Sequence, residues 1–208
     1  MADIYDFIPR ELMILDFANS KITRTAAPHD LFTEYPYVVH WLRHLDVLND
    51  EQASGLLQAA EEHSDLAQAA LEQINDLRDA CFGLFTDAAR KKPLSAAHLA
   101  VLNRHLREAL GQRRLAAAEP EGARWEWDLP PASLDWMRYP LALAAAELLT
   151  SDQAGRIREC DGCYWLFLDT SRNGKRRWCN MKICGNREKA RRHYERTRKK
   201  PATEREGQ

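Results

Sequence analysis

Four cysteines near the C-terminus have the spacing of a zinc site. Cys160 and Cys163 form a C-x2-C pair, fifteen residues follow, and Cys179 and Cys184 form a C-x4-C pair. Thiolates with this spacing are typical of structural sites that hold one Zn²⁺ ion in a tetrahedron of sulfur atoms. We therefore predict one structural zinc ion per chain on these four side chains, and a small finger folded around it.

The fifth cysteine, Cys81, belongs to a different pattern. It lies in a stripe of apolar residues spaced three and four apart along a predicted helix: Leu66, Ala70, Ile74, Leu77, Leu84 and Ala88. A free cysteine in such a stripe behaves as a small buried hydrophobic residue. We expect Cys81 to be a buried thiol and not a zinc ligand.

Patterns typical of catalytic sites are missing from the sequence. It has no Gly-rich phosphate loop, no G-x-S-x-G and no Cys/His nucleophile arrangement. His40 and His44 lie four apart, but no acidic residue completes an H-E-x-x-H pattern, so we interpret both as surface or packing residues. His193 is too far along a predicted helix from Cys184 to share its ion. We expect the protein not to be an enzyme.

Charge divides the chain into an acidic and a basic part. Residues 1–150 contain 14 Lys and Arg against 23 Asp and Glu, whereas residues 151–208 contain 16 against 8. An acidic body with a basic C-terminal part favours a polyanion-binding module joined to a domain that does not itself touch nucleic acid. The N-terminus shows no signal-peptide pattern, and the longest apolar run, 141–149, is too short to span a membrane. We therefore expect a cytoplasmic protein, where reduced cysteines favour metal binding over disulfides.

Periodicity predicts a mainly α body arranged as an antiparallel helical bundle. Apolar residues recur at helical spacing over 37–48, 50–62, 65–91, 96–115 and 141–149. Asn49, Ser64 and Ser95 stand where N-caps are needed. The alternation in 124–129 predicts a short strand with Trp125 and Trp127 on one face. We expect the two tryptophans to close an edge of the core, the alternative being a stacking platform for a ligand.

The finger is predicted to contain a knuckle, a β-hairpin and a helix, as in a treble clef, with a zinc ribbon as the structural alternative. Gly162 permits a tight turn between Cys160 and Cys163. Residues 165–169 and 175–178 read as the two strands of the hairpin, joined by a turn at 171–174. A helix follows Cys184, with Asn186 as its expected N-cap.

The helix after Cys184 is strongly basic on one side. A helical wheel places Ala190 and Tyr194 toward Trp165, Phe167 and Trp178, and basic residues on the opposite side. We predict that nucleic acid is bound by Lys175, Arg176, Arg187, Lys189, Arg191, Arg192, Arg196 and Lys199. Arg187, at the start of the helix, is our candidate for reading a base edge. The alternative is a solvated charged face without a partner.

These residues resemble the CGNR zinc finger, which is named for the motif that Cys184-Gly-Asn-Arg187 matches. The resemblance rests also on Cys160-x-x-Cys163, Phe167-Leu-Asp169, Ser171-Arg-Asn173, Arg177-Trp-Cys179, Met181, Lys189 and Arg191. Leu15-Asp-Phe-Ala-Asn-Ser20 is similar to the opening of the ABATE domain, which precedes this finger in bacterial putative stress-induced transcription regulators. Ser20 stands where that motif has Thr.

The resemblance implies zinc and a DNA-binding role. We expect a helical ABATE-like sensor domain over 1–150, a CGNR finger over 156–200 and a polar tail over 201–208. The sensor would bind an unknown small molecule or protein, and Asp16, Phe17 and Asn19 could line its pocket, although such residues can also cap a helix. The alternative function is an RNA-binding or protein-interaction adaptor with a purely structural zinc. We further expect residues 1–150 to fold alone.

Overall fold

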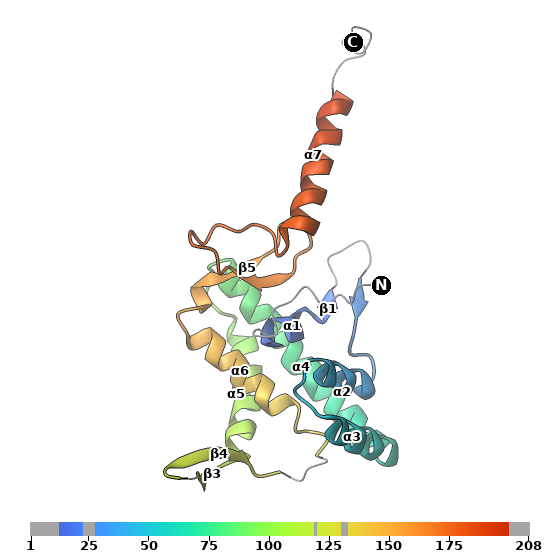
Figure 1. Ribbon diagram of the computed structural model, residues 1–208, viewed down its shortest axis with the longest axis vertical. Helices are drawn as coiled ribbons and strands as arrows, with labels where there is room; N and C mark the ends of the chain where they lie inside the picture. The colour runs from blue at the N-terminus through green and yellow to red at the C-terminus, as the bar shows by residue number, and fades with distance from the viewer. Residues whose placement is uncertain (1–12, 23–27, 119, 130–132, 200–208) are drawn as a thin grey trace.

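The chain folds into a helical body from which one helix extends (Figure 1). The computed structural model describes residues 13–22, 28–118, 120–129 and 133–199. The helices of the body are α1 (Met13–Asn19), α2 (Tyr35–His44), α3 (Asp50–Glu62), α4 (Ser64–Ala89), α5 (Ala96–Gly111) and α6 (Arg138–Thr150). The short strands β1 (Lys21–Ile22) and β2 (His29–Asp30) form an antiparallel pair. The prediction of a mainly α fold is confirmed.

The long helix α4 is the centre of the body, and helices α1, α2, α3, α5 and α6 all pack against it (Figure 1). Its inner face carries the predicted apolar stripe, in which Ile74, Leu77, Cys81 and Leu84 are fully buried. Cys81 is therefore a core residue, as predicted, and burial raises the pKa of its thiol above the usual range. Leu66, at the other end of the stripe, is an exception because it is exposed.

Helix capping follows the sequence at two of three predicted positions. Asn49 and Gln52 form a reciprocal capping box, and the Ser95 hydroxyl accepts a hydrogen bond from the His98 backbone N–H. Ser64 is not a cap, because α4 already begins at this residue and follows α3 with only His63 between them.

A β-hairpin replaces the end of one predicted helix. The expected helix over 96–115 stops at Gly111, and β3 (Arg113–Ala117) pairs antiparallel with β4 (Ala123–Trp127). The helical periodicity of residues 112–115 does not decide their structure. Pairing with β4 does, and it places Leu115 opposite Trp125. Trp127 is half-buried and stacks on Tyr139, but Trp125 is 56% exposed, so the expectation that both tryptophans close the core is wrong for Trp125.

The C-terminal part begins with a second hairpin, whose buried side chains belong to the core of the body. A 3-10 turn, η3 (Ala154–Arg156), leads into β5 (Ile157–Glu159), which pairs with β6 (Leu166–Leu168). Ile157, Leu166 and Leu168 belong to the same buried cluster as the helices. The chain then forms a π-helical turn, η4 (Met181–Gly185), and α7 (Asn186–Lys199).

The predicted partner strand of this hairpin needs correction, and the shared core bears on the expectation that residues 1–150 fold alone. Residues 165–169 do supply a hairpin strand, but its partner is β5, which precedes the knuckle, and 175–178 form no strand. A fragment of residues 1–150 would lack β5 and β6 and would leave their contact surface on α1 and α4 open to water. The structure thus argues against a body that folds independently of the finger.

Candidate metal centre and nucleic-acid interface

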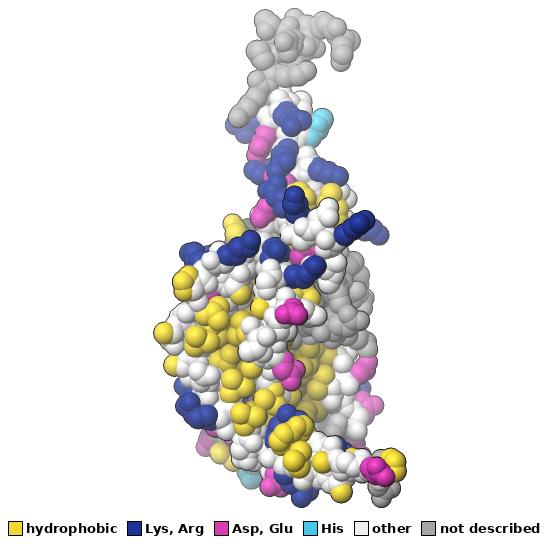
Figure 2. Space-filling model, turned by 90° about the vertical axis from the view of Figure 1, so that its left-hand side faces the viewer, with side chains coloured by type: hydrophobic (Ala, Val, Ile, Leu, Met, Phe, Trp, Pro, Cys, Tyr) yellow, Lys and Arg dark blue, Asp and Glu magenta, His cyan; other side chains and the backbone are white. Residues whose placement is uncertain are grey.

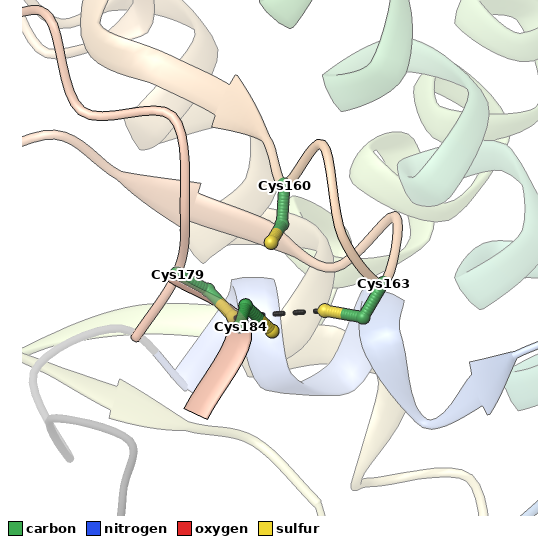
Figure 3. A group of neighbouring side chains, drawn as sticks. All are labelled: Cys160, Cys163, Cys179 and Cys184. Carbon is green, nitrogen blue, oxygen red and sulfur yellow. Dashed lines mark hydrogen bonds between the residues drawn. The ribbon is translucent and has the colours of Figure 1, made fainter. Parts of the chain in front are cut away.

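The four predicted cysteines converge on one point (Figure 3). Their sulfur atoms all lie within 4.8 Å of one another, and the Sγ–Sγ distances are 3.6 Å for Cys163–Cys179 and 3.8 Å for Cys179–Cys184. A tetrahedral site with Zn–S bonds of about 2.3 Å requires sulfur atoms about 3.8 Å apart. The donor set and its spacing therefore fit one structural Zn²⁺ ion, and the predicted ligands are confirmed.

The first cysteine pair is held by a tight knuckle between β5 and β6. The Tyr164 N–H donates to the Cys160 carbonyl, and the Cys160 N–H donates to the Trp165 carbonyl. Gly162 suits this close approach, because a Cβ atom there would lie 3.3 Å from Cys184 Cβ and would push the two segments slightly apart. Tyr164 takes a left-handed conformation with φ of 63° to close the turn.

The second cysteine pair is held by Asn180. Its side-chain oxygen accepts hydrogen bonds from the backbone N–H groups of Lys182 and Ile183 at the start of η4. This cap turns the chain so that the sulfur atoms of Cys179 and Cys184 lie 3.8 Å apart. Asn186 does not act as the predicted N-cap, because it has helical dihedral angles and directly continues η4 into α7.

Electrostatics show why this cluster needs a cation. Hydrogen bonds from the thiol of Cys163 and, as the next largest cause, from the thiol of Cys179 lower the pKa of Cys160 far below its usual range. The hydrogen bond with Cys160 in turn raises the pKa of Cys163 to about 12, and that of Cys179 rises as well. Among Cys160, Cys163 and Cys179, the negative charge of one thiolate thus opposes ionisation of its neighbours, and a divalent ion would supply the positive charge that lets them act together as thiolate ligands.

Arg187 supports this centre directly. Its guanidinium donates a hydrogen bond of 3.1 Å to the Gly162 carbonyl and another of 3.7 Å to Cys184 Sγ. The positive charge lies beside a cluster that remains net negative when zinc is bound, and the bond to Gly162 ties α7 to the knuckle. The guanidinium is thus engaged inside the finger, and reading a base would require it to leave these acceptors, so that role of Arg187 stays a prediction.

Arg176 is also used within the finger. It donates to the carbonyls of Trp178 and Cys179, and its guanidinium lies over the Phe167 ring, 5.0 Å from the centroid. Neighbouring Arg177 lies over Trp178 and pairs with Asp161. These contacts brace the segment that leads to Cys179, whereas Lys175 is exposed and makes no ion pair with the described residues.

Sequence reasoning missed the role of Asp169. Its carboxylate is fully buried and accepts hydrogen bonds from the N–H and hydroxyl of Ser171 and from the Arg176 N–H. It thereby shapes the loop that carries Arg172 and Lys175. The available signal was the Asp-x-Ser spacing, which is typical of an Asp side chain that bonds to backbone two residues on.

Helix α7 extends away from the body (Figure 1), and its contacts with described elements concentrate on η4. Ala190 and Tyr194 are exposed, Tyr194 by 66%, so the predicted packing of these residues on the finger's aromatic side chains is wrong. The helix is stabilised by its own ion pairs, because Glu188 binds Arg191 and Arg192. These two arginines hold the pKa of Glu188 at about 2.

The basic residues of α7 therefore fall into two sets. Arg191 and Arg192 are committed to Glu188, and Arg191 also to Glu195. Lys189, Arg196 and Arg198 are exposed and make no ion pair with the described residues. Spaced seven apart, Lys189 and Arg196 lie on one face of the helix. Lys199 ends the helix, and its side chain lies outside the described part.

The three predicted pocket residues lie in α1 and are buried. Phe17 packs against Phe32 and Trp41, and the Asn19 side chain both donates to the Leu166 carbonyl and accepts from the Leu166 N–H, at 2.8 Å each. Asn19 thus fastens the finger's hairpin to the body. Burial raises the pKa of Asp16 to about 7, and its Oδ1 atom has no hydrogen-bond partner among the described residues. A ligand role for the three stays a prediction.

Two surface hollows of the body lie elsewhere. One of about 610 Å³ is lined by residues of α2, α3 and the loop between them, including His40, Arg43 and Asp50. The other, of about 200 Å³, lies between the ends of α2, α3 and α4 and is lined by Tyr35, Leu57 and Ala67 among others. Among the described helices, none is long and apolar enough to cross a membrane.

Comparison with known protein families assigns both parts of the chain. Residues 156–197 match the CGNR zinc finger, and residues 12–152 match ABATE, which is described as "Putative stress-induced transcription regulator". No curated protein matches the chain. The cysteine cluster lies within the first match, and the helical body coincides with the second. The chain therefore belongs to the ABATE family of putative stress-induced transcription regulators and carries a CGNR zinc finger with one structural zinc ion.

Proposed function

We propose that this protein is a non-enzymatic transcription regulator whose finger binds duplex DNA and whose helical body responds to a ligand or partner. The observation that carries the proposal is the placement of α7. The helix projects from the body with seven Lys and Arg against two Glu, and Figure 2 shows the dark blue basic side chains along it. An α-helix fits the major groove of B-DNA, and basic side chains on it neutralise phosphates.

We assign the DNA contacts to cations that make no ion pair with the described residues. Lys189 and Arg196 form the phosphate-binding face of α7, and Lys175 adds a contact from the loop held by Asp169. Arg191 and Arg192 can turn to phosphates only by leaving Glu188, so their contribution is smaller. A helix of this length is marginal alone in water, and the zinc centre together with Arg187 holds its first turn.

The body can influence the finger because the two share a core. Asn19 in α1 bonds the backbone of Leu166, and Arg90 at the end of α4 forms a bidentate pair with Glu159 of β5. A ligand that shifts α1 or α4 would move the hairpin that carries Cys160 and Cys163. This connection supports a sensor that acts on the finger's orientation.

The proposal is tested by selecting binders from random duplex DNA with zinc-loaded full-length protein, with RNA present as competitor. We expect enrichment of a duplex sequence, and little competition by RNA at equal concentration of nucleotides. Preferential capture of the RNA, or enrichment of neither, would favour the adaptor function instead. A Lys189→Ala/Arg196→Ala variant serves as the control for binding through α7.

A further inference from the structure

The β3–β4 hairpin lies at the end of the molecule remote from α7 (Figure 1). Its two faces differ. One face presents Leu115 and Trp125, which lie directly opposite each other, together with Arg113 and Trp127 at the base. The other face presents Arg114 opposite Glu126, with Arg124 also paired to Glu126. The hairpin is thus an amphipathic pair of strands.

The apolar face of this hairpin is open to solvent near its tip. Leu115 is 63% exposed and Trp125 is 56% exposed, and Leu110 at the end of α5 is 58% exposed. Yellow apolar side chains are visible at this lower end of the molecule in Figure 2. The Arg113 guanidinium covers part of the surface by lying over the Trp125 and Trp127 rings. Large apolar side chains grouped on an exposed strand pair are typical of an interaction surface.

The outer edge of β4 also has unused backbone groups. The Ala118 N–H donates to the Gly122 carbonyl, and the Asp128 N–H donates to the Gln112 carbonyl. In the register of this hairpin, in which Arg113 lies opposite Trp127, these two bonds set the alternation of the antiparallel ladder, so that the backbone N–H and C=O groups of even-numbered residues of β4 face β3. The N–H and C=O groups of Ala123, Trp125 and Trp127 therefore point outward, and within the described residues no strand pairs with them.

The sequence of β4 is complementary to itself when two copies run antiparallel. If Trp125 lies opposite Trp125 of a second copy, Arg124 lies opposite the other copy's Glu126, and Glu126 opposite its Arg124. Ala123 then faces Trp127 of the second copy, and all outward N–H and C=O groups find partners. Sliding one strand by two residues, the smallest shift that keeps the outward groups of both strands facing each other, instead places Arg124 against Arg124, or Glu126 against Glu126, which is unfavourable.

We propose that the outer edge of β4 pairs with β4 of a second copy of this chain, with the two-fold axis at Trp125. The two hairpins form one four-stranded antiparallel sheet. The exposed tryptophans and leucines of both copies then share one face of that sheet, and both α7 helices stay uncovered. Since a single hairpin buries far less than a standard interface of about 1,600 Å², the dimer is expected to be weak and reversible.

Two charge reversals test the register, with sedimentation velocity of the full-length zinc-loaded protein over a concentration series as the measurement. Wild-type protein should dimerise with increasing concentration. Arg124→Glu alone and Glu126→Arg alone each replace two attractive cross-strand pairs by two repulsive ones, and should weaken the dimer roughly tenfold or more. An equimolar mixture of the two variants restores both attractive pairs and should form a heterodimer.

Each variant also loses the ion pair between Arg124 and Glu126 of its own chain. That pair is still missing in the mixture, so association regained there must come from contacts between the two chains. Circular dichroism should show that both variants keep the wild-type fold. Arg107→Glu, which makes the same charge change on an exposed face of α5, should dimerise like wild type. Three results would overturn the proposal: a wild-type protein that stays monomeric up to roughly 100 µM, in the range of transient complexes, single variants that dimerise normally, or a mixture that does not associate.

Discussion

At the residue scale, the finger depends on side chains that lie just outside the zinc ligands. Arg187 binds both the knuckle carbonyl of Gly162 and the sulfur of Cys184, so it completes the centre from the first turn of α7. Arg176 does the same for the segment before Cys179. Two arginines that look available for nucleic acid in the sequence are thus part of the scaffold.

Arg187→Ala should weaken zinc binding about 10- to 100-fold, which is the usual effect of losing a residue that bonds to a metal ligand. Arg187→Lys should recover only part of this loss, because an ammonium group cannot match the geometry of the guanidinium. Competition with a chromophoric chelator measures the affinity. Arg198→Ala, a change on an exposed residue of the same helix, is the control, and equal zinc affinity for all four proteins would refute this role.

Asp16 predicts a dependence of stability on pH. Its folded pKa of about 7 lies above the unfolded value of 3.8, so the folded protein holds the proton more tightly. The free energy of unfolding should therefore fall as pH rises from about 4 to 7 and stay level above 7, as far as this group is concerned. Asp16→Asn should remove that loss and stabilise the protein more at pH 8 than at pH 5 in urea unfolding. Asp65→Asn, at an exposed position, should not, and a pH-independent difference for Asp16→Asn would contradict the argument.

At the element scale, local patterns predicted α3 and α4 closely, since both have an apolar stripe, and α6 was marked by its continuous Ala- and Leu-rich run. Local patterns also predicted the four zinc ligands, because the spacing of the cysteines in the sequence is typical of a zinc site. They failed where pairing between distant segments decides the structure. Leu115 continues the helical periodicity of α5 but pairs with Trp125, and Leu166 pairs with a strand on the far side of the knuckle.

Zinc loss should affect the two halves of the finger differently. In Cys179→Ser, the loop at 171–178, η4 and α7 lose their attachment, whereas β5 and β6 remain in the body's core. Hydrogen–deuterium exchange should show fast exchange over 171–199 and retained protection at 157–159 and 166–168. Wild-type protein treated with a chelator should give the same pattern. Equal exchange in β5–β6 and α7 would mean that the finger unfolds as one unit.

At the scale of the whole molecule, the body and the finger's β5–β6 hairpin share one core, from which the helix α7 projects. The main core runs from the helices into β5 and β6, and the smaller cluster around Cys160, Cys184 and Phe167 lies beyond them. The proposed action of a ligand-bound body on a DNA-binding helix would pass through this shared core.

Truncations test this unity. Residues 1–150 lack Ile157, Leu166 and Leu168, whose burial is worth about 1.5–3 kcal/mol each, a large share of the 5–15 kcal/mol typical of a whole domain. The fragment should show no cooperative thermal transition. A chain that ends at residue 188 keeps all four cysteines and Arg187, and its body should melt like that of the full-length protein. A 1–150 fragment with a full-length melting temperature would contradict the shared core.

The central claim, that the free cations of α7 bind duplex DNA, is tested most directly by the salt dependence of binding. Fluorescence titrations of a duplex with zinc-loaded protein give log K against log salt for the wild type, for Lys189→Ala/Arg196→Ala, and for Arg43→Ala/Arg107→Ala as a charge-matched control on the body. If both α7 residues contact phosphates, the slope should become shallower by about 1.8 in the α7 variant and stay unchanged in the control. An unchanged slope in the α7 variant, or an equal change in both variants, would contradict the account.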